Sequence, residues 1–107
     1  MKKNQDMNEM VIFRKWKKAK YDVINGTIIA LWPAVAADRN GNCNSYEHVG
    51  QHGGADYQGV IAKTLPATPK EYADLLAELK QIGYNPIVIK KATSKMRKYR
   101  TDMAAIS

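Results

Sequence analysis

The sequence contains one cysteine, Cys43, which excludes an intramolecular disulfide. Small secreted domains usually carry several cysteines, so a single one favours a reducing, intracellular compartment. Long apolar runs are also missing. The longest, residues 28–37, contains Pro33 and covers about half of the length that a membrane-spanning helix needs. Residues 1–9 are polar and do not resemble a secretion signal. We therefore expect a soluble, cytoplasmic protein that does not bind membranes.

The sequence also lacks the motifs of several large functional classes. It has no Ser-His-Asp arrangement, no dinucleotide-binding fingerprint and no cysteine–histidine zinc framework, and it contains two histidines. Cys43 has no basic neighbour in the sequence that would make its thiol reactive. We therefore predict no cofactor and no metal site, and a non-enzymatic role is favoured.

Positive charge is in excess, with a net charge of +7 over 107 residues. Basic side chains are concentrated in residues 1–20 and 90–107, and the segment between them is mildly acidic. If the two ends meet on the folded surface, they form one positive patch that attracts nucleic acid or an acidic protein surface. The alternative is that both ends are solvated tails. The predicted patch consists of Arg14, Lys15, Lys17, Lys18, Lys95, Arg97, Lys98 and Arg100.

Residues 69–82 carry the clearest signature of a helix. Thr68 and Glu71 have the spacing of a capping box, Pro69 suits the first helical position, and Gly83 suits a left-handed C-terminal cap. Apolar residues recur between them at spacings of three and four, which predicts one buried face. These residues are Tyr72, Leu75, Leu76, Leu79 and Ile82.

Two segments rich in β-branched and aromatic residues, 10–16 and 27–32, predict strands. We expect them to pair as an antiparallel hairpin, because Asn25-Gly26 favours a tight turn before the second strand. Pro33 is expected to end that strand. The remaining expected elements are a turn at 38–44, strands at 45–49, 59–63 and 87–89, and a short basic helix at 93–106.

This order, β-β-β-(β)-α-β, predicts an α+β fold: a small antiparallel sheet of three to four strands with one amphipathic helix packed on one face. We expect a flexible N-terminus over 1–9, a single α+β domain over 10–92 and a basic C-terminal tail or short helix over 93–107. One helix leaves the other face of the sheet open as a binding surface. The candidates for this open face are Trp16, Trp32 and Tyr46. The alternative is that these aromatic residues are part of the core.

Both histidines lie in one glycine-rich segment, as His48 and His52. Two imidazoles that titrate near pH 7 are candidates for a general acid–base pair in phosphodiester cleavage. A shared metal ion is disfavoured, because the glycines oppose a helix and a strand would hold the two rings about 13 Å apart. Alternatively, the segment is a plain turn, or its backbone N–H groups form an anion-binding loop from Gly50, Gln51, His52, Gly53 and Gly54.

Several stretches resemble a group of short, uncharacterised proteins of bacteriophages and of mobile elements of gut bacteria. They are Phe13-Arg14-Lys15-Trp16, residues 28–33 and 45–52, Pro66-Ala67-Thr68 with Glu71-Tyr72, and Ile82-Gly83-Tyr84. The resemblance spans about residues 11–91, with a longer segment at 17–24 than the group has. It brings no settled activity, and it implies a phage accessory protein in the cytoplasm of a bacterial host.

The leading hypothesis is a small basic module that binds nucleic acid without catalysis, through phosphate contacts and counterion release. A second hypothesis is a protein-directed inhibitor or adaptor that binds the acidic surface of a host nucleic-acid-processing enzyme. A third is a small nuclease that uses His48 and His52. The sequence leaves open whether the partner is DNA, RNA or protein.

Overall fold

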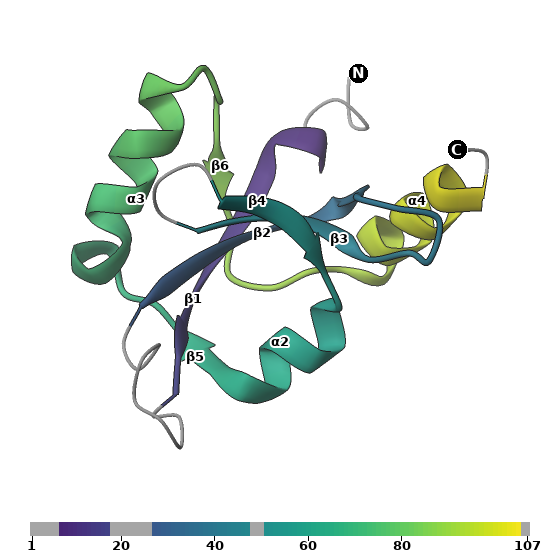
Figure 1. Ribbon diagram of the computed structural model, residues 1–107, viewed down its shortest axis with the longest axis horizontal. Coiled ribbons are helices and arrows are strands. Elements are labelled where there is room, and N and C mark those ends of the chain that lie inside the picture. The colour runs from purple at the N-terminus through teal and green to yellow at the C-terminus, as the bar shows by residue number, and fades with distance from the viewer. Residues whose placement is uncertain (1–6, 18–26, 48–50, 106–107) are drawn as a thin grey trace.

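The structure, a computed structural model, describes residues 7–17, 27–47 and 51–105; of Gln51 and His52 it describes the backbone alone. The described chain is α+β and forms a mixed, six-stranded sheet with helices packed around it (Figure 1). In chain order the elements are β1 Met10–Trp16, β2 Ile28–Ala36, β3 Cys43–Glu47, β4 Gln51–Ala55, α2 Tyr57–Lys63, β5 Thr64–Pro66, α3 Pro69–Gln81, β6 Ile87–Val88 and α4 Ser94–Ala105.

Strands β1 and β2 pair antiparallel, as the sequence predicts, and the sheet runs in the order β4-β3-β2-β1-β5. The outer edge of β1 pairs with two different strands. Parallel β6 pairs with the start of β1, and antiparallel β5 pairs with its end. Between them, the carbonyls of Val11 and Phe13 accept from the N–H groups of Ile89 and Ala67. The edge of the sheet is therefore split beside Phe13, where β6 ends and β5 begins as the partner of β1.

Helix α3 covers one face of the sheet and forms as predicted. Thr68 accepts from the Glu71 N–H and the Glu71 carboxylate accepts from the Thr68 N–H, which completes the capping box. Gly83 follows with a φ of 110°, a left-handed conformation that favours glycine. Leu75 and Leu79 of α3 pack against apolar residues of the sheet, which are Val11, Phe13, Ala30, Trp32 and Tyr46.

The opposite face of the sheet is not open. Helix α2 packs on it, and Val60 joins Ile29, Leu31 and Cys43 in a second apolar cluster. Helix α4 packs against the far end of β2, where Met96 contacts a cluster with Met7 and Ala34. The predicted fold, one helix on three or four strands, therefore has too few helices and too few strands. The expected aromatic binding face is absent from the described chain, because Trp32 and Tyr46 are buried in the α3 cluster and Trp16 is half-buried beside α2.

Two segments differ from their predicted secondary structure. Residues 59–63 belong to α2 rather than to a strand, since Tyr57, Val60, Ile61 and Thr64 lie at helical spacing. Gly59 obscured this pattern, and a Cβ there would meet the Asp56 Oδ2 at 2.7 Å, which requires only that the exposed Asp56 side chain turn aside. The described part of the predicted glycine-rich turn is strand β4.

Pro33 does not end the second strand. Strand β2 continues to Ala36, and its pairing with β3 shifts register between Trp32 and Ala36. Because Pro33 lies inside this irregularity, its missing N–H removes no ladder hydrogen bond. The turn at Asp38 and the basic helix at 94–105 form as the sequence predicts. Within the described residues, every helix is too short or too polar to cross a membrane.

Candidate functional site

Two of the predicted patch residues hold the end of a helix instead of facing a partner. The Arg14 guanidinium donates to Thr64 Oγ1 at 2.8 Å, to the Thr64 carbonyl at 2.9 Å and to the Ile61 carbonyl at 3.2 Å. Lys17 Nζ donates to the Ala62 carbonyl at 3.1 Å. Cations at a helix C-terminus satisfy its free carbonyls and its negative dipole end. Partial burial of Arg14 lowers the pKa of its guanidinium. These contacts assign Arg14 and Lys17 to the fold of α2.

Lys15 is neutralised by α3. Its Nζ donates to the Glu71 carboxylate, and both side chains are about one-third exposed. The hydrogen bond from Lys15 and the bond from the Thr68 N–H lower the pKa of Glu71. One carboxylate thus closes the capping box and pairs with a strand lysine, which fixes α3 against β1. Lys18 lies outside the described residues.

The basic helix α4 turns one of its arginines inward. Arg100 is 7% exposed, on the same side of the helix as buried Met96 and Ala104. Its Nη1 donates to the Pro33 carbonyl at 2.8 Å, and its Cζ lies 5.6 Å from the ring centroid of Tyr57, the first residue of α2. Lys98 forms an exposed ion pair with Asp102, a kind of contact that contributes little.

Four of the predicted cations are therefore engaged within the fold, and the single patch formed by both ends of the chain stays a prediction. Arg14 contacts the last turn of α2 and Arg100 contacts its first residue, so this helix lies between β1 and α4 (Figure 1). Of the predicted patch residues that the structure describes, Lys95 and Arg97 are exposed, and their side chains form no ion pair or hydrogen bond there.

A different basic surface is present, the segment Lys90–Lys98, here called the basic strap. It begins just after β6 and continues into the first turns of α4. All five of its cations are exposed, and the first acidic residue after it is Asp102. Sequence reasoning passed over the first two of them, although they lie in the basic C-terminal third of the chain. The cations of the strap are Lys90, Lys91, Lys95, Arg97 and Lys98.

The basic strap borders a groove of about 670 Å³ at the split edge of the sheet. Phe13 and Tyr72 line it as a stacked pair, with ring centroids 4.4 Å apart and planes at 13°. Val88, Ile89, Pro66 and Pro69 contribute further apolar lining, and Arg14, Lys90 and Lys91 bring positive charge. The groove exists because β5 and β6 leave β1 in different directions. Its chemistry suits a ligand with a flat apolar part and a negative charge.

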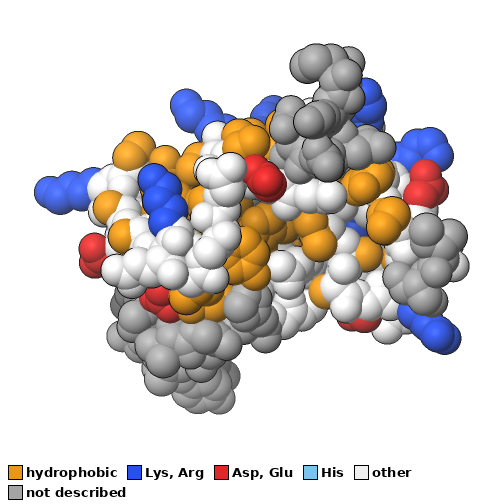
Figure 2. All heavy atoms as spheres, turned by 90° about the horizontal axis from the view of Figure 1, so that it is seen from above, with side chains coloured by type: hydrophobic (Ala, Val, Ile, Leu, Met, Phe, Trp, Pro, Cys, Tyr) orange, Lys and Arg blue, Asp and Glu red, His pale blue; other side chains and the backbone are white. Residues whose placement is uncertain are grey.

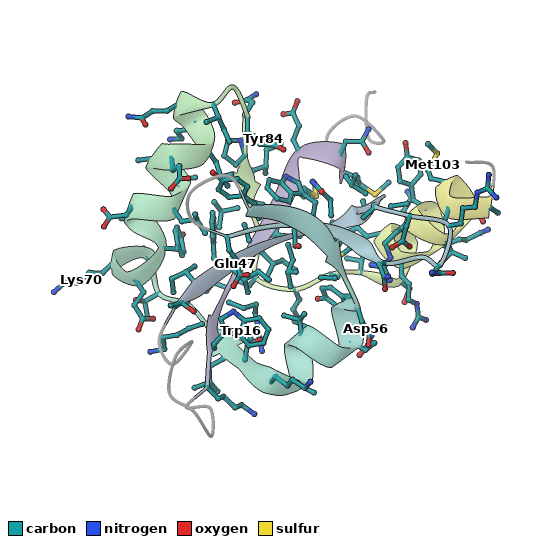
Figure 3. The ribbon with its side chains drawn as sticks, in the orientation of Figure 1. Trp16, Glu47, Asp56, Lys70, Tyr84 and Met103 are labelled. Carbon is teal, nitrogen blue, oxygen red and sulfur yellow. The ribbon has the colours of Figure 1, made fainter. Side chains whose placement is uncertain are left out.

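A smaller apolar hollow of about 340 Å³ lies at the end of β2. Tyr84, after α3, and Met103, from α4, stand on its two sides (Figure 3). Seen from this side, hydrophobic side chains gather in the middle of the molecule and lysines and arginines lie around its outline (Figure 2). Trp32 forms part of the lining and contacts Tyr84, with ring centroids 4.9 Å apart. The described lining residues carry no charge, so the hollow offers no group that would select an ionic ligand.

The histidine and glycine-loop hypotheses gain no support from the structure. His48 and Gly50 lie outside the described residues, as do the side chains of His52 and Gln51. Gly53 and Gly54 are in β4, paired with Ser45 and Asn44. Alternating strand N–H groups do not converge on one ion, as an anion-binding loop requires. Both hypotheses therefore stay predictions.

Cys43 lies fully buried in the α2 cluster. Burial raises the pKa of its thiol to about 11, which disfavours the reactive thiolate. Among the described side chains, no group of three or more His, Cys, Asp or Glu residues is placed to hold a metal ion.

Comparisons of the chain with protein families, with curated proteins and with solved structures find no match. The site therefore rests on its own geometry.

Proposed function

We propose that this protein binds single-stranded nucleic acid without catalysis, with the phosphates on the basic strap and an unpaired base in the groove beside it. The observation that carries this proposal is the run of five exposed cations from Lys90 to Lys98, two of which line an apolar groove. Proteins that bind single strands combine a positive path along the backbone with aromatic or apolar walls for the bases. The groove at the split sheet edge supplies such a wall through half-buried Tyr72, which stacks on buried Phe13.

The proposal keeps the predicted ligand and changes the residues that bind it. Arg14, Lys15, Lys17 and Arg100 have structural partners. The phosphate contacts are therefore assigned to the cations of the strap. If all five release counterions, the slope of log K against log[salt] for a single strand is about −3.5.

A salt titration tests the proposal. Fluorescence anisotropy of a labelled single-stranded oligonucleotide is followed between about 50 and 300 mM salt, where the Debye length falls from about 14 to 6 Å. We expect affinity to fall steeply, with a slope between about −3 and −4. Absence of binding at the lowest salt, or binding that does not depend on salt, contradicts the proposal.

A second candidate function is binding to a protein, as an inhibitor or adaptor for a host nucleic-acid-processing enzyme. The observation in its favour is that three aliphatic side chains are exposed on the two strands beside the groove: Leu65 at 47%, and Ile87 and Val88 at 38% each. Phosphate contacts do not require them, whereas a protein partner could bury them. This candidate predicts that Leu65→Ser, a change outside the groove lining, abolishes capture of a partner from host lysate and leaves oligonucleotide affinity unchanged. If the wild-type and the variant protein capture the same amount of partner, this candidate function is contradicted.

A further inference from the structure

The first turn of α4 and the first turn of α2 border an open cavity of about 160 Å³. Thr93, Ser94 and Arg97 line it from the α4 side, Tyr57 from the α2 side, and Arg100 from the interior. A water molecule occupies about 30 Å³ of liquid, so the cavity has room for a tetrahedral oxyanion. No carboxylate is among the described residues that line it. The cavity is thus small, polar and positively charged.

Arg100 is the unusual feature of this cavity. It is more than nine-tenths buried, and its Nε atom has no hydrogen-bond partner in the described part of the chain. One hydrogen bond, from Nη1 to the Pro33 carbonyl, is formed by a group that offers five donors. The ring of Tyr57 offsets part of the cost of burying this charge. Because Nε is closed to solvent, an anion in the cavity would reach the Nη donors of the guanidinium, and such a contact would recover part of the cost of burying its charge.

The N-terminus of α4 points to the same kind of ligand. Thr93 Oγ1 accepts from the Met96 N–H at 3.2 Å, and the Thr93 carbonyl accepts from the Arg97 N–H. The N–H groups of Ser94 and Lys95 come earlier in the helix and have no intrahelical acceptor. Free N–H groups and the positive dipole end make such a terminus a favourable position for an anion.

We propose that this cavity is a phosphate-binding site, formed by Arg97, Arg100 and the first turn of α4. Arg97 is exposed at the mouth, where it can contact an entering anion, and Arg100 lies behind it. Binding of the phosphate group stands on this geometry alone. The identity of its carrier, the terminal phosphate of a nucleic-acid strand or a free small phosphate, rests on the proposed function, because Arg97 also belongs to the basic strap.

Arginine Nε–H resonances in ¹H–¹⁵N spectra test the site directly, with inorganic phosphate added at constant ionic strength. We expect the Arg100 resonance to shift along a saturable curve with a millimolar Kd, about −4 kcal/mol of binding. The Arg14 resonance is the internal control, because its Nε already donates to Thr64 Oγ1. A common shift of both resonances, or no shift of Arg100, overturns the proposal.

Two exposed arginines provide matched variants. Arg97→Gln should weaken phosphate binding about tenfold, the loss of roughly one charge-assisted hydrogen bond. Arg39→Gln makes the same replacement at an exposed arginine that lies outside both the cavity lining and the basic strap, and it should change the Kd less than twofold. Equal effects of the two variants would mean that net charge, not a site, attracts the anion.

Oligonucleotides with and without a 5′-phosphate identify the carrier. Stronger competition for Arg100 by the 5′-phosphorylated strand supports the site and assigns the strand end to it. If inorganic phosphate shifts Arg100 but neither oligonucleotide does, the site is supported and takes a small phosphate. If inorganic phosphate shifts the Arg100 resonance but the protein binds no oligonucleotide in any assay, the proposed function is contradicted and the phosphate site is still supported.

Discussion

The guanidinium of Arg14 donates two hydrogen bonds to Thr64, from Nε to the side-chain hydroxyl at 2.8 Å and from Nη2 to the carbonyl at 2.9 Å. Thr64 is itself buried, and its hydroxyl donates to the Val60 carbonyl at 2.7 Å. This relationship joins β1 to the end of α2 over fifty positions of sequence. Arg14 therefore stabilises the fold, although its place in the basic N-terminal segment predicts a role in binding a partner.

We expect Arg14→Met to lower the free energy of unfolding by about 2–3 kcal/mol, because it removes the Arg14 donor from the hydroxyl oxygen and the carbonyl of buried Thr64. Arg39→Met is the matched control. Arg39 is exposed in the turn after β2, and its replacement should change stability by less than about 0.5 kcal/mol. Urea unfolding of both variants measures the difference. Equal stability of the two variants would show that the Arg14 contacts do not support α2.

Glu71 makes the fold sensitive to acid. Its pKa is lowered in the folded protein by Lys15 and by the Thr68 N–H. A lowered pKa means that the charged form stabilises the fold above the carboxyl's ordinary value of 4.5, and that this contribution is lost as the pH falls through the lowered value. Glu71→Gln should therefore reduce stability at pH 7 and have a smaller effect near pH 3.

Unfolding by urea at the two pH values measures this effect. Asp74→Asn, on the exposed side of the same helix, is the control for general charge effects. A Glu71→Gln penalty that is as large at pH 3 as at pH 7 would exclude the ion pair and capping box as its cause.

Cys43 should be protected from alkylation in the folded protein. With the pKa of its thiol near 11, the thiolate fraction at pH 8.5 is about 100-fold below that of an unfolded cysteine. Burial slows the reaction further. Iodoacetamide labelling followed by mass spectrometry, with and without denaturant, measures the ratio of rates. Rapid labelling of the native protein would contradict the burial of Cys43 in the α2 cluster.

Local signals made part of this fold predictable. The α3 boundaries follow from Thr68, Glu71 and Gly83, which act within a few residues of each other. The β1–β2 hairpin likewise follows from adjacent segments. Helix α2 was missed because it is short and contains Gly59, a residue type that disfavours helices.

The site was less predictable, because its contacts join residues distant in sequence. Lys90 and Lys91 reach the groove beside Arg14 only because β6 pairs in parallel with β1. Arg100 is drawn inward by the Pro33 carbonyl and the Tyr57 ring, which come from other parts of the chain. The sequence of α4 alone places Arg100 on the same side of the helix as Met96, but it does not show that the guanidinium is buried.

The central claim is that the basic strap, rather than net charge, binds nucleic acid. Two double variants with the same change in net charge test it most directly. Lys90→Gln with Lys91→Gln removes two cations of the groove, and Lys63→Gln with Lys80→Gln removes two exposed lysines of α2 and α3. The measurement is the salt dependence of oligonucleotide binding for both variants. The account predicts that the first pair weakens binding at least about tenfold at 100 mM salt and makes the slope shallower by about 1.4, while the second pair changes both little. Equal losses for the two pairs would contradict it.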